Sequence, residues 1–152
     1  EAGTLRLALG VRSHDTFMAR RLVDHGGVGV IQIDTGRIGG IGPAKEIADY
    51  AVKRGITFVN HTFASHLALS ASVQPYAGLE SHELCEFSAE PKALAFEIIS
   101  SHLMPHADGL LRRADAPGLG MAFDPHTIKR YLGDVEISAK GKTLYRAPRS
   151  AA

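Results

Sequence analysis

The sequence has 152 residues, 45% of them hydrophobic, which is enough to form the core of a single domain. Its 17 basic and 16 acidic residues leave a formal net charge of +1, and no stretch concentrates the basic ones, so nucleic acid is not expected as the main partner. No apolar run is long enough to span a membrane, no signal peptide is evident, and the single Cys85 cannot form an internal disulfide, so we expect a cytoplasmic protein.

The first part of the chain predicts a strand followed by a helix. Residues 5–9 form an apolar run of strand length. Asp15 is a typical N-cap residue, and the helix predicted after it ends at the glycines within residues 25–27. A strand and the helix after it are the repeating unit of a parallel sheet.

The same unit is then predicted twice more. Residues 28–33 form the second strand, and the helix that follows has Pro43 in its first turn and ends at Gly55. Residues 56–60 form the third strand, and the Ala-, Leu- and Ser-rich segment 63–73 is predicted to be a tightly packed helix. The repeat of about 25 residues per unit predicts a parallel sheet with crossover helices.

The remaining segments are less regular. Residues 82–87 read as a fourth buried strand, and residues 105–120 are rich in turn residues. Residues 125–132 read as a short helix. Residues 135–145 alternate in polarity around a glycine turn, which predicts a terminal hairpin.

Three of the four predicted strands end on a titratable side chain. Asp34, His61 and Glu86 follow the second, third and fourth strands at about equal steps, whereas Gly10 and Val11 follow the first. In barrels of parallel strands, chemistry sits at the carboxyl ends of successive strands. Alone, an Asp there is commonly a cap or turn residue and a His is commonly structural. Their common phase favours a general base with an acid partner and a second acid.

Three segments of the chain together resemble a known family. They are IQIDTGRIGGI, ITFVNHTFASHLALSAS, and the tail DGLLRRADAPGLGMAFDPHTIKRYL at residues 108–132. These segments are similar to the C-terminal part of the enolase superfamily, in its mandelate racemase-like subgroup. The resemblance runs from about Leu5 to Leu132. It implies the α/β fold of a partial TIM-type barrel with four βα units, corresponding to strands five to eight, in a domain of residues 1–132. Residues 133–152 would be a tail with a hairpin.

The resemblance also implies roles for the three strand-end residues. Enzymes of the family remove the proton α to a carboxylate and use Mg²⁺ to stabilise the product anion. His61 would be the general base or acid. Asp34 would hydrogen-bond His61 and fix its tautomer, and Glu86 would donate a hydrogen bond to the carboxylate of a small substrate.

Within the family, the residue at position 34 helps to choose the subgroup. The muconate lactonizing enzyme subgroup carries a lysine where Asp34 stands, so that subgroup is not expected. Acid-sugar dehydration, a lyase reaction, is expected ahead of racemisation, an isomerase reaction. Four further residues either line the site or serve as turn and helix-surface residues, and we prefer the second interpretation for Arg37, Asn60, Ser65 and His66.

Two features depart from the family. A complete barrel takes about 250 residues, so the first four strands, with two metal carboxylates, and the capping domain are not expected in this chain. In addition, Val11 occupies the position at which the family carries the Glu that is its third metal ligand. Valine offers no oxygen to Mg²⁺. By resemblance, then, no protein ligand for the metal is expected, and the truncated chain is expected to be inactive alone.

A half-barrel would leave open sheet edges, which invite association. The expected partner is a second copy of the chain or a separate N-terminal half. The alternative to an enzyme-derived half is a non-catalytic folded module whose role is assembly. A metal site built from histidines is a weaker alternative, because the eight histidines are scattered and Pro105 separates His102 from His106.

Overall fold

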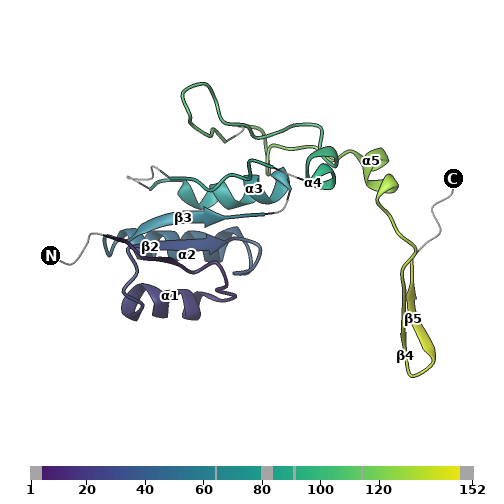
Figure 1. Cartoon of the computed structure of the whole chain (residues 1–152), viewed down its shortest axis with the longest axis horizontal. Helices are drawn as coiled ribbons and strands as arrows, with labels where there is room; N and C mark the ends of the chain where they lie inside the picture. The colour runs from purple at the N-terminus through teal and green to yellow at the C-terminus, as the bar shows by residue number, and fades with distance from the viewer. Residues whose placement is uncertain (1–4, 64, 80–83, 91, 114, 148–152) are drawn as a thin grey trace.

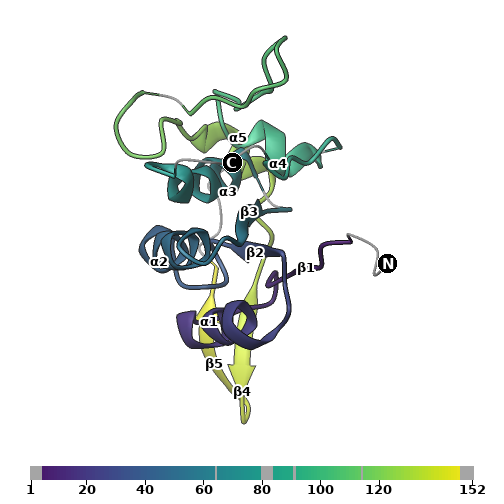
Figure 2. The same cartoon turned by 90° about the vertical axis from the view of Figure 1, so that its left-hand side faces the viewer.

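The computed structural model describes residues 5–63, 65–79, 84–90, 92–113 and 115–147. Its main body is an α/β unit with a parallel sheet in the order β1-β2-β3 (Figure 1). The strands are β1 (Ala8–Leu9), β2 (Val30–Asp34) and β3 (Thr57–His61). Each strand is followed by a helix, and Figure 2 shows the helices succeeding one another alongside the strands. The prediction of a parallel sheet with crossover helices is therefore confirmed for three units.

The helices begin where the sequence supplies a cap or a glycine. Helix α1 (Thr16–His25) is capped by Asp15, whose Oδ1 accepts a hydrogen bond of 2.7 Å from the Met18 amide. Helix α2 (Ile41–Val52) has no side-chain cap and instead starts after Gly40, whose φ of +121° favours glycine.

The third helix starts later than the sequence predicted. Helix α3 (His66–Val73) follows Ser65, whose hydroxyl accepts a hydrogen bond from the Ala68 amide. A 3₁₀ turn (Gln74–Tyr76) continues the chain past its end. The predicted start at residue 63 was wrong because Ser65 caps the helix at that point, so that the first helical residue is His66.

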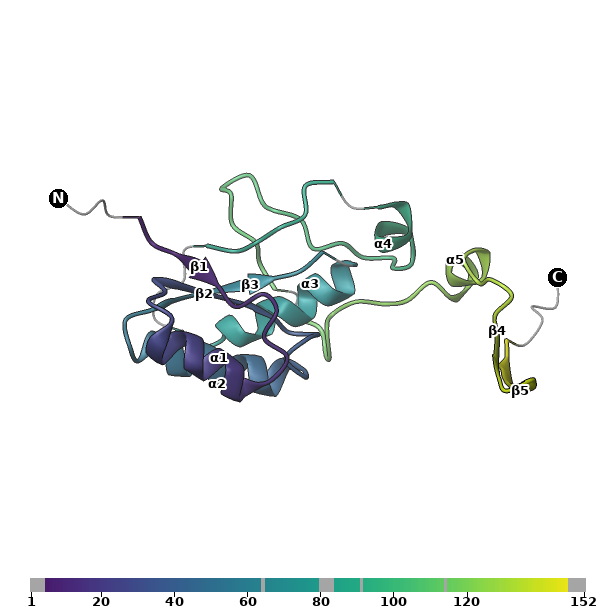
Figure 3. The same ribbon diagram turned by 60° about the horizontal axis from the view of Figure 1, so that its bottom comes forward.

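The core lies between the sheet and the first two helices. Ile31 and Ile33 of β2 and Phe58 of β3 pack against buried alanines of α1 and α2, including Ala19 and Ala48. Figure 3 shows α1 and α2 side by side along the sheet. Because successive side chains of a strand point to opposite faces, the residues between the core positions lie on the other face of the sheet.

The predicted fourth strand is not formed in the described part of its range. Residues 82 and 83 lie outside the described residues, and residues 84–88 belong to no strand. They still lie beside β3, because the Asn60 side chain binds the backbone of Glu86 on both its N–H and its C=O. Side-chain bonds replace a backbone ladder here, so the sheet of the described chain has three strands and not four.

The C-terminal third adds short elements. They are α4 (Ala93–Glu97), α5 (Pro125–Arg130), β4 (Glu136–Ala139) and β5 (Lys142–Arg146). Strands β4 and β5 pair antiparallel as a hairpin that projects away from the main body (Figure 1), and all of their residues are exposed. No helix among the described residues is long and apolar enough to cross a bilayer. A domain boundary after Leu132 remains a prediction.

Candidate active site

The carboxyl ends of β2 and β3 lie next to each other. Asp34 and His61, the last residues of the two strands, are direct partners in the parallel register. Residues paired in this way point to the same face of a sheet. That face is opposite to the one that packs on α1 and α2, because Ile33 and Phe58 face the helices. The two residues predicted from their phase along the sequence are therefore brought together at one edge.

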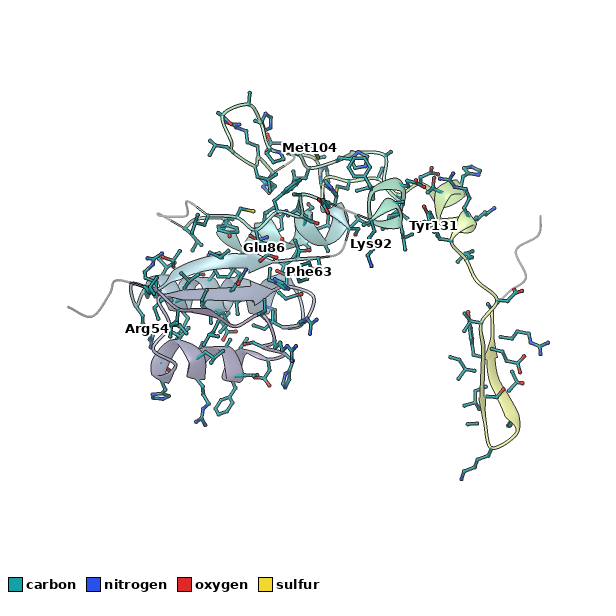
Figure 4. All side chains as sticks on the ribbon, in the orientation of Figure 1. Arg54, Phe63, Glu86, Lys92, Met104 and Tyr131 are labelled. Atoms are coloured by element: carbon teal, nitrogen blue, oxygen red, sulfur yellow. The ribbon has the colours of Figure 1, made fainter. Side chains whose placement is uncertain are left out.

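Glu86 reaches the same edge from a segment outside the sheet. Its Oε1 accepts a hydrogen bond of 3.2 Å from the Thr62 amide and lies 2.9 Å from His61 Nδ1. Its Oε2 accepts a hydrogen bond from Gln32 Nε2. Figure 4 shows Glu86 above the sheet strands. A carboxyl group with this many hydrogen-bond donors around it is held in one orientation. Its donation to the carboxylate of a substrate stays a prediction.

His61 is enclosed on most sides. Its side chain is 10% exposed, and its ring meets the ring of Phe63 edge to face at a centroid distance of 4.7 Å. Nδ1 approaches Glu86 within ion-pair distance but outside hydrogen-bond direction, and no other described residue bonds that atom. The tautomer with its proton on Nδ1 would place that proton beside the Glu86 carboxylate and leave Nε2 as the basic nitrogen.

Asp34 makes no hydrogen bond to His61 in the described chain, although the sequence predicted one. Its Oδ1 accepts a hydrogen bond of 3.0 Å from the Arg37 amide, and its Oδ2 lies 3.5 Å from Arg37 Nε. No hydrogen bond or ion pair joins Asp34 to His61 within the described chain. The aspartate folds back on the turn that follows its own strand, which is common for Asp, and Glu86 stands at Nδ1 instead.

Four residues had two possible interpretations from the sequence, as site residues or as turn and helix-surface residues, and the structure separates them. Ser65 caps α3, and Arg37 is an exposed partner of Asp34, so both are turn or cap residues. Asn60 is fully buried and holds Glu86. His66 is 3% exposed, so it is not a helix-surface residue.

The position after β1 does not suit a metal ion. Gly10 has a φ of +121°, and an added Cβ would lie 2.7 Å from the backbone oxygen of Gln32, so the chain must carry glycine there. Val11 follows it and has no oxygen on its side chain. In the described chain, no three His, Cys, Asp or Glu side chains gather as a metal site. The residues present therefore do not fit the Mg²⁺ site of the family.

Three hydroxyl groups near the strand ends have unused hydrogen-bonding capacity. Ser13, Thr35 and Thr62 follow β1, β2 and β3, and all are at most 7% exposed. Their hydroxyl oxygens are buried and have no hydrogen-bond partner among the described residues. Buried polar groups without partners are rare in folded proteins, and a role in binding or catalysis is one explanation for them.

Sequence reasoning missed Gln32, and it did not give Asn60 a role in the site. Gln32 lies two residues before Asp34, so the strand period of two places both on the same face, and this signal was available. Asn60 points the other way, and nothing in a single sequence shows that its amide reaches a segment 26 residues further on.

Comparison with known proteins places the chain in one family. Residues 1–127 match the family described as enolase C-terminal domain-like. A crystal structure of a predicted mandelate racemase from Rhodobacter sphaeroides is 51% identical, with a TM-score of 0.89, over 98% of this chain and 38% of that one. A putative dehydratase from Salmonella typhimurium is 26% identical, with a TM-score of 0.78, over 87% of this chain and 33% of that one.

Two curated relatives are named by their reactions. An o-succinylbenzoate synthase from Geobacillus stearothermophilus is 31% identical over 123 residues, which are 80% of this chain and 32% of that protein. A D-galactonate dehydratase from Xanthomonas euvesicatoria pv. vesicatoria (strain 85-10) is 27% identical over 132 residues, which are 84% of this chain and 35% of that protein. The chain thus spans about a third of the length of the curated relatives it matches.

Proposed function

The chain belongs to the family of enolase C-terminal domain-like proteins, and on this premise we propose that it carries the proton-transfer part of a site that removes the proton α to a carboxylate. Its three strands and the segment at Glu86 would correspond to strands five to eight of a barrel. The fold is of the type that the family requires, and the matched region covers residues 1–127.

The observation that carries this proposal is the approach of His61 and Glu86. The 2.9 Å between Nδ1 and Oε1 places a carboxylate behind an imidazole, as an acid–base pair requires. His61 would take or return the proton through Nε2. Glu86 would orient the ring and stabilise the imidazolium that forms, which is the role that the sequence predicted for Asp34. Asp34 would border the site as a second acid.

The proposed substrate is a small carboxylic acid, and acid-sugar dehydration is proposed ahead of racemisation. Two relatives whose names include a dehydratase activity support this preference. The o-succinylbenzoate synthase among the relatives is matched at similar identity. For this reason the proposal is limited to the α-proton step and the carboxylate class, and the individual acid remains to be found by a screen.

We propose further that residues 1–152 do not turn over an acid by themselves. Nothing on the described chain replaces the metal ligand that Val11 lacks, so the negative charge of an α-carbanion would have no metal ion to stabilise it. The remaining groups would come from the part of the barrel that this chain does not span. The comparisons favour this enzyme-derived interpretation over a module whose role is assembly alone.

A chimera tests the proposal. In the chimera, residues 5–132 replace the matching segment of the Rhodobacter sphaeroides protein, which supplies the rest of the barrel. One version keeps Val11 and the other carries Val11→Glu. The measured quantity is deuterium incorporation at the α-carbon of a panel of acid sugars in D₂O with Mg²⁺. We expect exchange with Val11→Glu and none with Val11. We also expect His61→Asn to slow the exchange by about 10² to 10⁴-fold. Exchange that is indifferent to His61→Asn contradicts the proposal.

A further inference from the structure

Glu86 reaches the candidate site from a segment that no strand ladder holds. Residues 84–88 form no strand. Within the described chain, the backbone of Glu86 bonds to the Asn60 side chain at both its N–H and its C=O, and the adjacent Cys85 thiol is a further donor to that C=O. Asn60 Oδ1 accepts a hydrogen bond of 2.8 Å from the Glu86 N–H, and Asn60 Nδ2 donates one of 3.1 Å to the Glu86 C=O. This two-point bond is what a neighbouring strand would otherwise provide.

Asn60 is itself fixed from behind. It is fully buried, and its Nδ2 also donates a hydrogen bond of 2.9 Å to Ser72 Oγ on α3. The backbone N–H of Asn60 donates a hydrogen bond of 2.9 Å to the Tyr76 hydroxyl. That hydroxyl donates one of 2.8 Å to the backbone oxygen of Leu84. A buried amide with its bonds satisfied in this way has one strongly preferred orientation, because any rotation leaves polar atoms unpaired.

The two ends of Glu86 are therefore controlled by different groups. Gln32 and the Thr62 amide orient the carboxylate, and Asn60 sets where the backbone lies along β3. Asn60 directly precedes His61 in the chain, so the residue that holds the acid is bonded covalently to the residue that carries the imidazole. The separation of the Glu86 carboxylate and the His61 imidazole is thus set by a short series of bonds through Asn60.

We propose that Asn60 is a positioning residue that sets the distance between Glu86 and His61. Its role rests on the proposed function, because the pair matters only if it moves a proton. The Asn60 side chain itself points to the opposite face of the sheet from Asp34 and His61, and it acts through Glu86. The chain uses an amide side chain in place of a strand ladder, so Asn60 is the residue of β3 that holds both the N–H and the C=O of Glu86.

The test is solution NMR of the 152-residue chain, with three variants. Asn60→Leu removes both bonds to Glu86 at similar volume. Ser72→Ala is the matched control, because it removes another bond of the same Nδ2 group and leaves the bonds to Glu86. We expect Asn60→Leu to speed hydrogen exchange of the Glu86 amide by roughly tenfold and to shift the ring nitrogens of His61, assigned by their loss in His61→Asn. Ser72→Ala is expected to do neither.

Loss of folding in Asn60→Leu does not remove the test. In the wild-type chain, a scalar coupling across the hydrogen bond between the Glu86 nitrogen and the Asn60 Cγ is expected, and its absence overturns the proposal. Equal shifts of His61 in Ser72→Ala and Asn60→Leu also overturn it, since they indicate a general packing effect. These readouts need no turnover, so their failure is distinct from a failure of the exchange assay on the chimera.

Discussion

Gly10 is the residue on which the end of β1 depends. Its φ is +121°, and only 2.7 Å would separate an added Cβ from the Gln32 oxygen, which leaves no room for a side chain. We expect Gly10→Ala to lower the free energy of unfolding by about 2 kcal/mol, measured by urea denaturation. Gly42→Ala is the control, because Gly42 lies in α2 with open space around it and should be neutral or slightly stabilising. Equal effects of the two changes would contradict the expectation.

The positions of Asp34 and His61 at one edge were predictable, and the partner of His61 was not. Strand ends that repeat in phase must meet in a parallel sheet, so spacing alone placed these two residues together. Which acid reaches Nδ1 depends on the turn after β2, where the Arg37 amide and guanidinium draw Asp34 away. Such competition between neighbouring donors depends on small differences in the distances between side chains, which cannot be read from the order of residues.

At the scale of elements, α3 is joined to a distant segment through a buried histidine. His66 Nδ1 accepts a hydrogen bond of 3.0 Å from the Leu103 amide, and the His66 ring packs edge to face on Phe96 and His102. Burial, and after it the nearby His102, lower the pKa of His66. Nδ1 can accept this bond only while it carries no proton, so the contact between α3 and residues 96–103 depends on a neutral ring.

This arrangement predicts a pH-dependent stability. Because the pKa of His66 is lower in the folded chain than its ordinary value of 6.5, the unfolded chain binds the extra proton more readily. The contribution of His66 to stability is therefore complete above about pH 6.5 and is lost as the pH falls toward the folded-state pKa. We expect the Tm of the wild type to fall more between pH 7 and pH 5 than that of His66→Asn, whose amide oxygen replaces the acceptor without titrating. Parallel curves would refute this role.

The elements themselves were largely predictable, and the exception has a physical cause. Asp15 as a cap, the glycines after α1 and Pro43 in the first turn of α2 are local signals, and they placed α1 and α2 correctly. Residues 82–87 have strand composition, but a strand exists only when its backbone finds a partner. In the described residues, the backbone N–H and C=O of Glu86 form hydrogen bonds with the Asn60 side chain and not with a neighbouring strand.

On the scale of the whole molecule, the segment at β1 leaves apolar side chains uncovered. Leu5 is 93% exposed and Leu7 is 59% exposed, and in the described chain β1 pairs with β2 alone. We predict that the chain associates with a second copy through this edge, giving a mass above that of one chain by light scattering. Leu5→Lys with Leu7→Lys should lower the association. Leu144→Lys on the projecting hairpin, where the leucine is 64% exposed, should not. A clean monomer would contradict the prediction.

We propose that Glu86, and not Asp34, is the acid partner of His61. The most direct measurement is the long-range ¹H–¹⁵N NMR spectrum of the His61 ring in the wild type, Glu86→Gln and Asp34→Asn, with His61→Asn for assignment. We predict a proton on Nδ1 in the wild type, a marked shift of the ring nitrogens in Glu86→Gln, and little change in Asp34→Asn. A spectrum that follows Asp34→Asn and ignores Glu86→Gln would contradict it.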